Sequence, residues 1–154
     1  MADERDILWG MYQEHCTQGR HHEDQRATMT NLIIAVAAAV IGLLSFKELS
    51  RGVWPLSVFL TLLGFFGALF SLKHYERFRY HMKCAAQYRN TLEKLLPDTR
   101  LRALREAAKS EHAGKYKIVE QVHLFIFWMV LNFLIAMLGA VITIVVLTKP
   151  SGAG

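Results

Sequence analysis

The stretch that decides the fold, residues 53–96, reads VWPLSVFLTLLGFFGALFSLKHYERFRYHMKCAAQYRNTLEKLL. Residues 53–72 are apolar and carry no charge, whereas the remainder is polar and strongly basic. Nothing between the two halves stops a helix, and the first breaker is Pro97, because the residue before a proline avoids helical geometry. We therefore predict one helix of about 65 Å at ~1.5 Å per residue, well beyond a ~30 Å hydrocarbon core.

Small residues recur on one face of the apolar half, at alternating intervals of four and three positions. They are Ser57, Thr61, Gly64, Ala68 and Ser71. This spacing keeps residues on one face of a helix, and small residues there let helices approach closely in lipid. The spacing continues into the polar half with mostly larger residues: Tyr75, Phe78, Met82, Ala85, Arg89, Leu92 and Leu96. We predict that this helix packs along its whole length.

Two other apolar runs accompany this helix in a chain of 154 residues. A run of about 17–25 apolar residues is typical of a transmembrane helix, and a soluble core helix of that length would carry a polar face. We expect spans at residues 30–46, 53–72 and 122–148, and hence an all-α integral membrane protein. The acidic start of the chain has no apolar run directly behind it, so we expect the first span to direct insertion without cleavage.

The basic residues are distributed unevenly around these spans. Fifteen of the 18 Lys and Arg residues fall within residues 1–29 and 73–121, and positively charged loops stay in the cytoplasm. The prediction is a cytoplasmic amino-terminal helix (1–29), a cytoplasmic helical hairpin (73–121) formed partly by extension of the second span, and a carboxyl terminus on the far side. We expect the second helix of this hairpin over about residues 100–112, followed by a turn at Gly114.

The first and third spans carry small residues at the same spacing. In the first span they are Asn31, Ala35, Ala38, Gly42 and Ser45, and in the third they include Asn132, Ala136, Gly139 and Thr143. Three such stripes in one chain predict a homo-oligomer held together by close helix contacts in the bilayer.

Asn132 is the only strongly polar side chain deep in the third span. An amide exposed to lipid is unfavourable, so Asn132 should face another helix or water. One hypothesis is a packing hydrogen bond, and the other is that Asn132 lines a pore or gate. No acidic side chain lies within a span, which disfavours a proton- or cation-coupled carrier.

Two polar segments are candidates for chemistry. Residues 14–24 contain His, Cys and acidic side chains, but not at the spacing of a zinc site, so we predict no metal. Residues 74–83 mix basic and aromatic side chains, which we interpret first as an anchor at the inner leaflet and alternatively as a site for an anionic ligand such as a nucleotide. Arg77, Arg79 and Arg89 are the candidates for ligand or signal input.

Arg89 lies on the packing face, where a charged side chain needs a partner. We expect that partner to be an acidic residue of the amino-terminal helix or a ligand. The chain has no glycine-rich phosphate loop, no His-Glu-x-x-His motif and no recognisable nucleophile–base pair. We therefore expect neither an enzyme nor a cofactor.

The layout over residues 8–112 resembles two groups of bacterial membrane proteins, the RipA-like octameric membrane family and the SLATT group of two-span effector domains. The positions that carry the likeness are Trp9, Tyr12, His15, residues 21–26, Thr30, Asn31, Tyr88, Arg89, Asn90, Leu92, Leu95, Leu96 and Pro97. The resemblance implies oligomerisation in the bacterial inner membrane. For SLATT proteins it also implies a pore-forming effector role in nucleotide-linked conflict or phage-defence systems.

Taken together, we expect a homo-oligomeric inner-membrane protein that permeabilises the membrane when a signal or partner acts on its cytoplasmic helices. The alternative is a non-conducting scaffold that recruits a cytoplasmic partner. The expected partners are the lipid bilayer, further copies of the chain, and a cytoplasmic protein or a nucleotide signal, but no nucleic acid.

Overall fold

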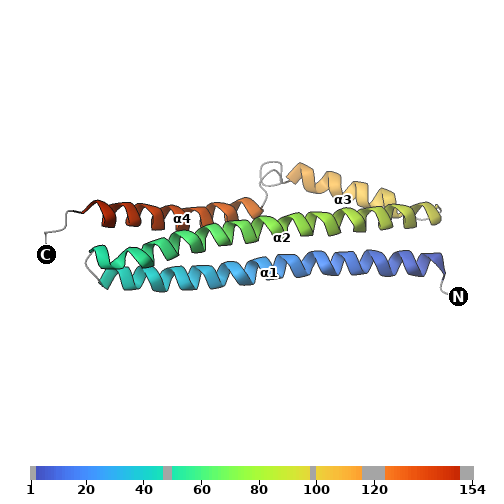
Figure 1. The fold of residues 1–154 in the computed structure, drawn as a ribbon. Helices are drawn as coiled ribbons and strands as arrows, with labels where there is room; N and C mark the ends of the chain where they lie inside the picture. Colours follow the sequence, from blue (N-terminus) through green and yellow to red (C-terminus); the bar gives the residue numbers. More distant parts are fainter. Residues whose placement is uncertain (1–2, 47–49, 98–99, 116–123, 150–154) are drawn as a thin grey trace. The chain divides into compact units, whose positions relative to one another are not determined.

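The structure is a computed structural model that describes residues 3–46, 50–97, 100–115 and 124–149 (Figure 1). Over these ranges the regular elements are all helical: α1 (Glu4–Phe46), the short 3-10 helix η1 (Arg51–Val53), α2 (Trp54–Leu95), α3 (Leu101–Lys115) and α4 (Leu124–Thr148). Among the described helices, α1, α2 and α4 are long and apolar enough to cross a membrane. The predicted all-α class with three such helices is confirmed.

Helix α2 is the long helix predicted from residues 53–96. It begins at Trp54, with Pro55 in the first turn, where the missing N–H is tolerated. It runs unbroken to Leu95 and stops before Pro97, as the proline requires. On the predicted packing face of its polar half, Ala85 is buried and the other positions are half-buried. The local pattern therefore determines both the extent of α2 and the face that packs.

Two boundaries differ from the expected layout. The amino-terminal segment and the first apolar run form one helix, α1, because no helix breaker separates residues 1–29 from residues 30–46. The predicted turn at Gly114 is wrong, since α3 continues to Lys115. Gly114 is exposed, and nothing lies within 4 Å of where its Cβ would be, so it fits in the last turn of an exposed helix.

The contacts divide the chain into two compact units, to which α1 and α2 both contribute. Unit 1 consists of Met1–Asp24 and His74–Leu124, and unit 2 consists of Gln25–Lys73 and Phe125–Gly154.

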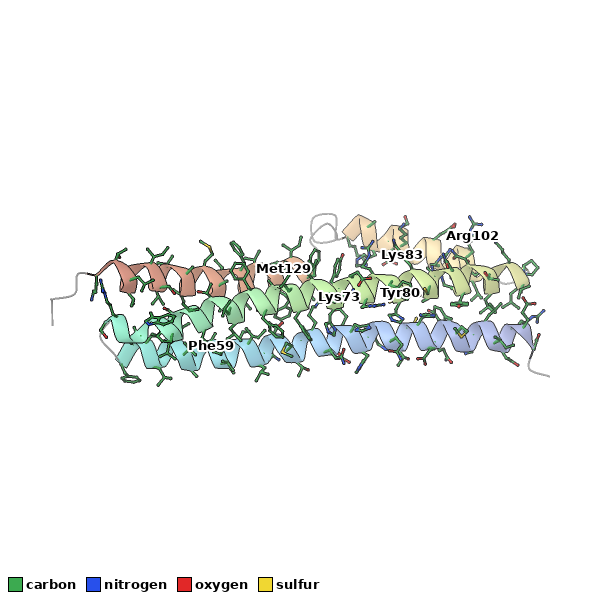
Figure 2. The ribbon with its side chains drawn as sticks, viewed as in Figure 1. Phe59, Lys73, Tyr80, Lys83, Arg102 and Met129 are labelled. Carbon is green, nitrogen blue, oxygen red and sulfur yellow. The ribbon has the colours of Figure 1, made fainter. Side chains whose placement is uncertain are left out.

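Unit 2 has a core of aliphatic side chains drawn from three α-helices and the 3-10 helix η1. The buried members are Ile33, Ala37, Val40 and Leu44 of α1, Val53 of η1, Leu60 of α2, and Ile135 and Val146 of α4. The outward side chains of this unit are largely apolar too, among them Phe59 (Figure 2). A surface so rich in large apolar side chains is unusual for a protein in water and matches a lipid environment.

Unit 1 is polar, and α2 contacts both α1 and α3 within it. A Cβ at Gly19 of α1 would lie 3.0 Å from the Met82 sulfur and 3.6 Å from the Phe78 ring, so glycine permits a close approach of α1 to α2. Helix α3 lies beside the carboxyl-terminal part of α2 (Figure 1), and the Arg105 guanidinium lies 3.2 Å from the Glu93 carboxylate.

Candidate functional site

The small residues of α2 and α4 face each other inside unit 2. A Cβ at Gly64 would lie 2.6 Å from the Asn132 carbonyl oxygen and 2.8 Å from the Ala136 Cα. A Cβ at Gly139 would lie 2.5 Å from the Thr61 amide nitrogen. These neighbours are backbone atoms, so the two helices are in backbone contact and no residue larger than glycine fits at either position.

Hydroxyl groups join α2 and α4 next to this contact. The Thr143 Oγ1 lies 2.9 Å from the Ser57 Oγ and 2.8 Å from the Gly139 carbonyl oxygen. Ser57 in turn donates to the Trp54 carbonyl oxygen at 2.9 Å. Because Ser57 is fully buried, its hydroxyl depends on protein partners rather than water.

Asn132 is completely buried at the same interface. Its amide nitrogen donates to the Trp128 carbonyl oxygen at 2.8 Å. A Cβ at Gly67 would collide with the Asn132 Oδ1. In glycine a hydrogen atom takes the place of the Cβ, so this hydrogen faces the amide oxygen, as in a weak Cα–H···O contact. No conventional donor from the described residues reaches that oxygen. The contacts favour the packing hypothesis for Asn132, because the chain itself covers the amide.

Gly67 was missed in the sequence because the 4-3 spacing passes from Gly64 to Ala68, although Gly67 is three residues after Gly64 and borders the same face of the helix. It is nevertheless buried, and its missing side chain makes room for both Asn132 of α4 and Ile33 of α1. The signal that could have found it is the single amide in the third span, which needs a small residue opposite.

The small-residue stripe of α1 is placed differently. Ala35 and Ala38 are exposed, and nothing lies within 4 Å of where a Cβ of Gly42 would be. The buried face of α1 is the opposite one, with Ile33 and Val40 in the core. Two of the three predicted stripes therefore meet within the chain, and the third lies on the outer surface of unit 2.

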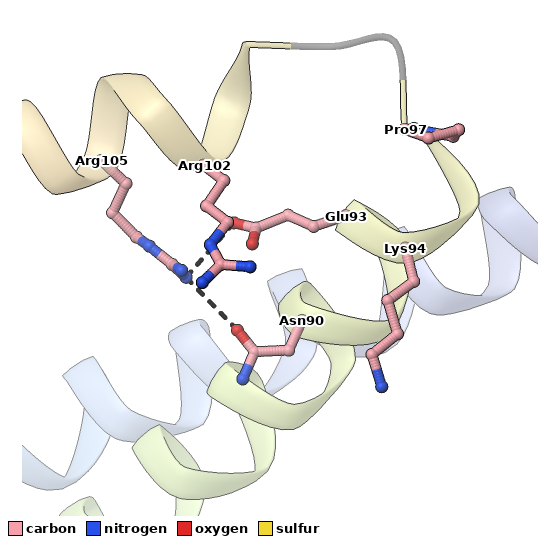
Figure 3. Close-up of a pocket in the computed structure, with 6 residues that line it drawn as sticks. All are labelled: Asn90, Glu93, Lys94, Pro97, Arg102 and Arg105. Carbon is pink, nitrogen blue, oxygen red and sulfur yellow. Dashed lines mark hydrogen bonds and ion pairs between the residues drawn. The ribbon is translucent and has the colours of Figure 1, made fainter.

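A second candidate site lies in unit 1, where α3 meets α2 (Figure 3). Arg105 reaches from α3 to the Glu93 carboxylate at 3.2 Å and to the Asn90 Oδ1 at 3.3 Å. A cavity of about 480 Å³ beside this contact is lined by Asn90, Glu93, Lys94, Pro97, Arg102 and Arg105. A neighbouring cavity of about 650 Å³ is lined by Arg89, Asn90, Arg105, Glu106, Ala108 and Lys109.

Both cavities carry an excess of positive charge. Each is lined by three Lys or Arg side chains and by one carboxylate, Glu93 in the first and Glu106 in the second. The hydrogen bond that Arg102 donates to Glu106 raises the pKa of Arg102 above its usual value. Guanidinium groups that remain charged and lie in a concave surface suit an anion with several oxygen acceptors.

Of the three arginines proposed for signal input, Arg89 lines the second of the two cavities described above. Arg89 lies 3.9 Å from Glu93, which is on its own helix and not on the amino-terminal helix, the first of the two expected sources of a partner; the second, a ligand, stays a prediction. Arg77 lies 3.8 Å from Glu76, and Arg79 donates to the Tyr75 hydroxyl at 3.4 Å. Neither lines a cavity described above.

Arg102 and Arg105 were missed as site residues. Their spacing of three on a short basic helix was the available signal, since it puts both on one face. What the sequence does not show is that this face meets Asn90 and Glu93 of α2, because that contact depends on the path of the chain between the two helices.

Within the described ranges, no group of three or more His, Cys, Asp or Glu side chains is placed to hold a metal ion. No protein-family model, curated protein or solved structure matches the chain. The functional inference therefore depends on the two sites above and on the sequence.

Proposed function

We propose that the chain is the subunit of a homo-oligomeric membrane effector, and that the oligomer lets ions cross the membrane when an anionic signal or a protein partner acts on α2 and α3. In this proposal the membrane is the bacterial inner membrane, and unit 1 with the amino terminus is cytoplasmic. The charge distribution supports this orientation, since 15 of the 18 basic residues precede or lie between the spans on one side.

The observation that carries the assembly is the outward-facing α1 stripe, made up of Asn31, Ala35, Ala38, Gly42 and Ser45, all of which are exposed except the half-buried Gly42. In α2 and α4, stripes of the same kind are used for a backbone contact. Among the residues that the structure describes, nothing makes such a contact with Gly42 of the α1 stripe, and the stripe carries the exposed amide of Asn31, which lipid solvates poorly. A helix of a second copy would cover it, as small-residue faces do in membranes.

The signal would enter at the cavities of unit 1. Their positive lining suits phosphate or carboxylate groups. The same helix, α2, carries Asn90 and Glu93 of these cavities and Gly64 and Gly67 of the packed interface. The conducting role comes from the resemblance to the RipA-like and SLATT proteins and is part of the proposal.

One observation favours a second candidate, a non-conducting scaffold. The chain covers Asn132, the one amide deep in the third span, so this group does not line a path for ions in a single subunit. A scaffold would use the same α1 stripe for assembly and the same cavities for a partner, but would leave the membrane sealed.

The substitution Ala38→Leu tests the assembly. It places a large side chain on the α1 stripe at an exposed position, so we expect the oligomer in detergent to dissociate while each subunit stays folded. The matched control is Ala39→Leu, which is also exposed but lies on the side of α1 that already presents Leu32 and Leu43. Multi-angle light scattering reports the mass, and an oligomer unchanged by Ala38→Leu contradicts the proposal.

Ion efflux from liposomes then separates the two candidates. For the effector, we expect efflux with the native chain and with Ala39→Leu, and loss of efflux with Ala38→Leu. If the native oligomer forms but the liposomes stay sealed with every anionic trigger tried, the scaffold is the better account.

A further inference from the structure

Four histidines form a continuous column between α1 and α2 in unit 1. His15 and His22 lie seven residues apart on α1, and His74 and His81 lie seven residues apart on α2. The Nδ1 atoms of His15 and His81 are 2.9 Å apart, and those of His22 and His74 are 3.3 Å apart. The His22 and His81 ring centroids are 5.4 Å apart, which joins the two pairs. We call these four residues the histidine column.

Whether the two rings of a pair attract or repel each other depends on how many of them are protonated. A hydrogen bond between two Nδ1 atoms needs an N–H on one ring and a lone pair on the other, so one ring of each pair must be neutral. When both rings are protonated, both nitrogens are donors and two positive charges face each other. The contact between α1 and α2 therefore loses its hydrogen bonds and gains repulsion as the second proton binds.

The surroundings of His22 favour its neutral form. Desolvation lowers the pKa of His22 below its usual value of 6.5, and the nearby His74, His21 and Arg77 lower it further. Glu76 acts in the opposite direction.

The surroundings of His81 act in the same way. Desolvation lowers the pKa of His81 below 6.5, followed by the positive charges of His15, His22 and Arg77, with Glu14 opposing them. Two aromatic rings border the column: Tyr88 is stacked on His15 with centroids 5.5 Å apart, and Tyr80 lies edge-on to His81 at 5.3 Å. Apart from the histidines themselves, the charged groups that act on the column are Arg77 and Glu76 of α2 and Glu14 of α1, so desolvation and the neighbouring imidazoles are the main causes of the lowered pKa values.

The direction of the pH effect follows from these shifts. Because the pKa values of His22 and His81 in the packed state lie below 6.5, these two residues bind more protons in the separated helices than in the packed helices as the pH falls through 6.5. The contact is therefore fully stable above pH 6.5 and weakens below it. This range is where histidine switches operate.

We propose that the histidine column is a proton-sensitive latch, which holds α1 against α2 in unit 1 at neutral pH and releases it on mild acidification. Release would loosen the part of α1 that precedes the first apolar run. The latch is a property of unit 1 and does not depend on whether the oligomer conducts ions.

The latch is tested by the distance between α1 and α2 in the full chain, reconstituted in nanodiscs. Spin labels at Gln13 and Lys83, both exposed, report this distance once Cys16 and Cys84 are replaced by serine. At about pH 7.5 we expect a narrow distribution of distances between the two labels. At about pH 5.5 we expect at least roughly half of the molecules to show longer distances. A distribution unchanged over this range overturns the proposal.

Substitutions of the histidines show whether the histidine column causes the change in distance at acidic pH. Replacing His15, His22, His74 and His81 together by glutamine keeps polar side chains that do not titrate, so we expect the acid response to disappear. The control is His21→Gln, an exposed neighbour of His22 outside the column, which should keep the response. A response that survives the fourfold substitution shows that other groups cause it and overturns the latch.

Two further readouts keep the test decisive if the fourfold variant does not fold. In the native chain, NMR titration of the imidazole signals should give midpoints below 6.5 for His22 and His81, and midpoints at or above 6.5 contradict the latch.

The second readout is the distance between the spin labels after zinc chloride is added. If zinc narrows the distance distribution, EDTA reverses the effect, and pH alone has none, the column is a metal clamp and the proposal is wrong.

Discussion

The backbone contact between α2 and α4 is tested by adding one methyl group to it, with Gly64→Ala or Gly139→Ala. At Gly139 the methyl carbon would lie 2.5 Å from the Thr61 amide nitrogen and 2.8 Å from the Ser57 carbonyl oxygen. Favourable contacts between heavy atoms lie at about 3.5–4.0 Å, so the helices must separate by about 1 Å. Overpacking of this kind costs about 1–3 kcal/mol, and alanine regains about 1 kcal/mol of helix propensity. We expect each substitution to lower the free energy of unfolding by up to about 2 kcal/mol, which is about 1–3 kcal/mol below an alanine substitution at a glycine that has room for the methyl group.

The matched control is Gly42→Ala, in the same unit. Nothing lies within 4 Å of the added methyl, so we expect the stability to stay the same or to rise by up to about 1 kcal/mol. Unfolding of the full chain in mixed micelles, followed by circular dichroism as the fraction of SDS increases, gives the comparison. If Gly64→Ala and Gly139→Ala are as stable as Gly42→Ala, the backbone contact is refuted. The double variant should lose less than the sum of the single variants, because the first methyl already separates the helices.

Two further substitutions test single contacts. Thr143→Val removes the hydroxyl that lies 2.9 Å from Ser57 Oγ and should cost about 0.6–1.7 kcal/mol in the same assay, whereas an unchanged stability shows that this hydroxyl does not join the helices. Arg105→Gln removes the 3.2 Å ion pair with Glu93, so amide hydrogen exchange in α3 should rise about fivefold. Arg102→Gln, whose ion pair is exposed and lies within α3, should change it little, and equal exchange in the two variants contradicts the docking role of Arg105.

The extent of α2 could be predicted because its causes are local. An apolar run, a polar run without breakers and a proline at position 97 lie in one stretch, and the helix ends within one residue of both expected limits. Gly114 shows the limit of such reasoning. A glycine ends a helix only where the chain must turn, and the sequence around Gly114 does not show that α3 goes on to Lys115.

The faces of the spans were harder to predict because lipid removes the usual signal. In water, a polar side of a helix shows which side is buried. In an apolar span both sides are apolar, and only small residues and single polar groups distinguish them. In α4 the amide of Asn132 and the glycine Gly139 mark the buried side correctly. In α1, alanines occupy four of the five positions from 35 to 39, so the small-residue pattern does not show that Ile33 and Val40 face the core.

The histidine column could be predicted only by comparing the sequences of two helices with each other. In an antiparallel helix pair, residues that face each other have numbers with a constant sum. The residue numbers in each histidine pair add to 96, which puts the midpoint at residue 48, between the first two predicted spans. Each helix alone shows only two histidines seven residues apart, which is weak evidence on a polar surface. The predicted hairpin supplies the register that brings them together, so the column could have been found from the sequence once the two spans were treated as a pair rather than as separate helices.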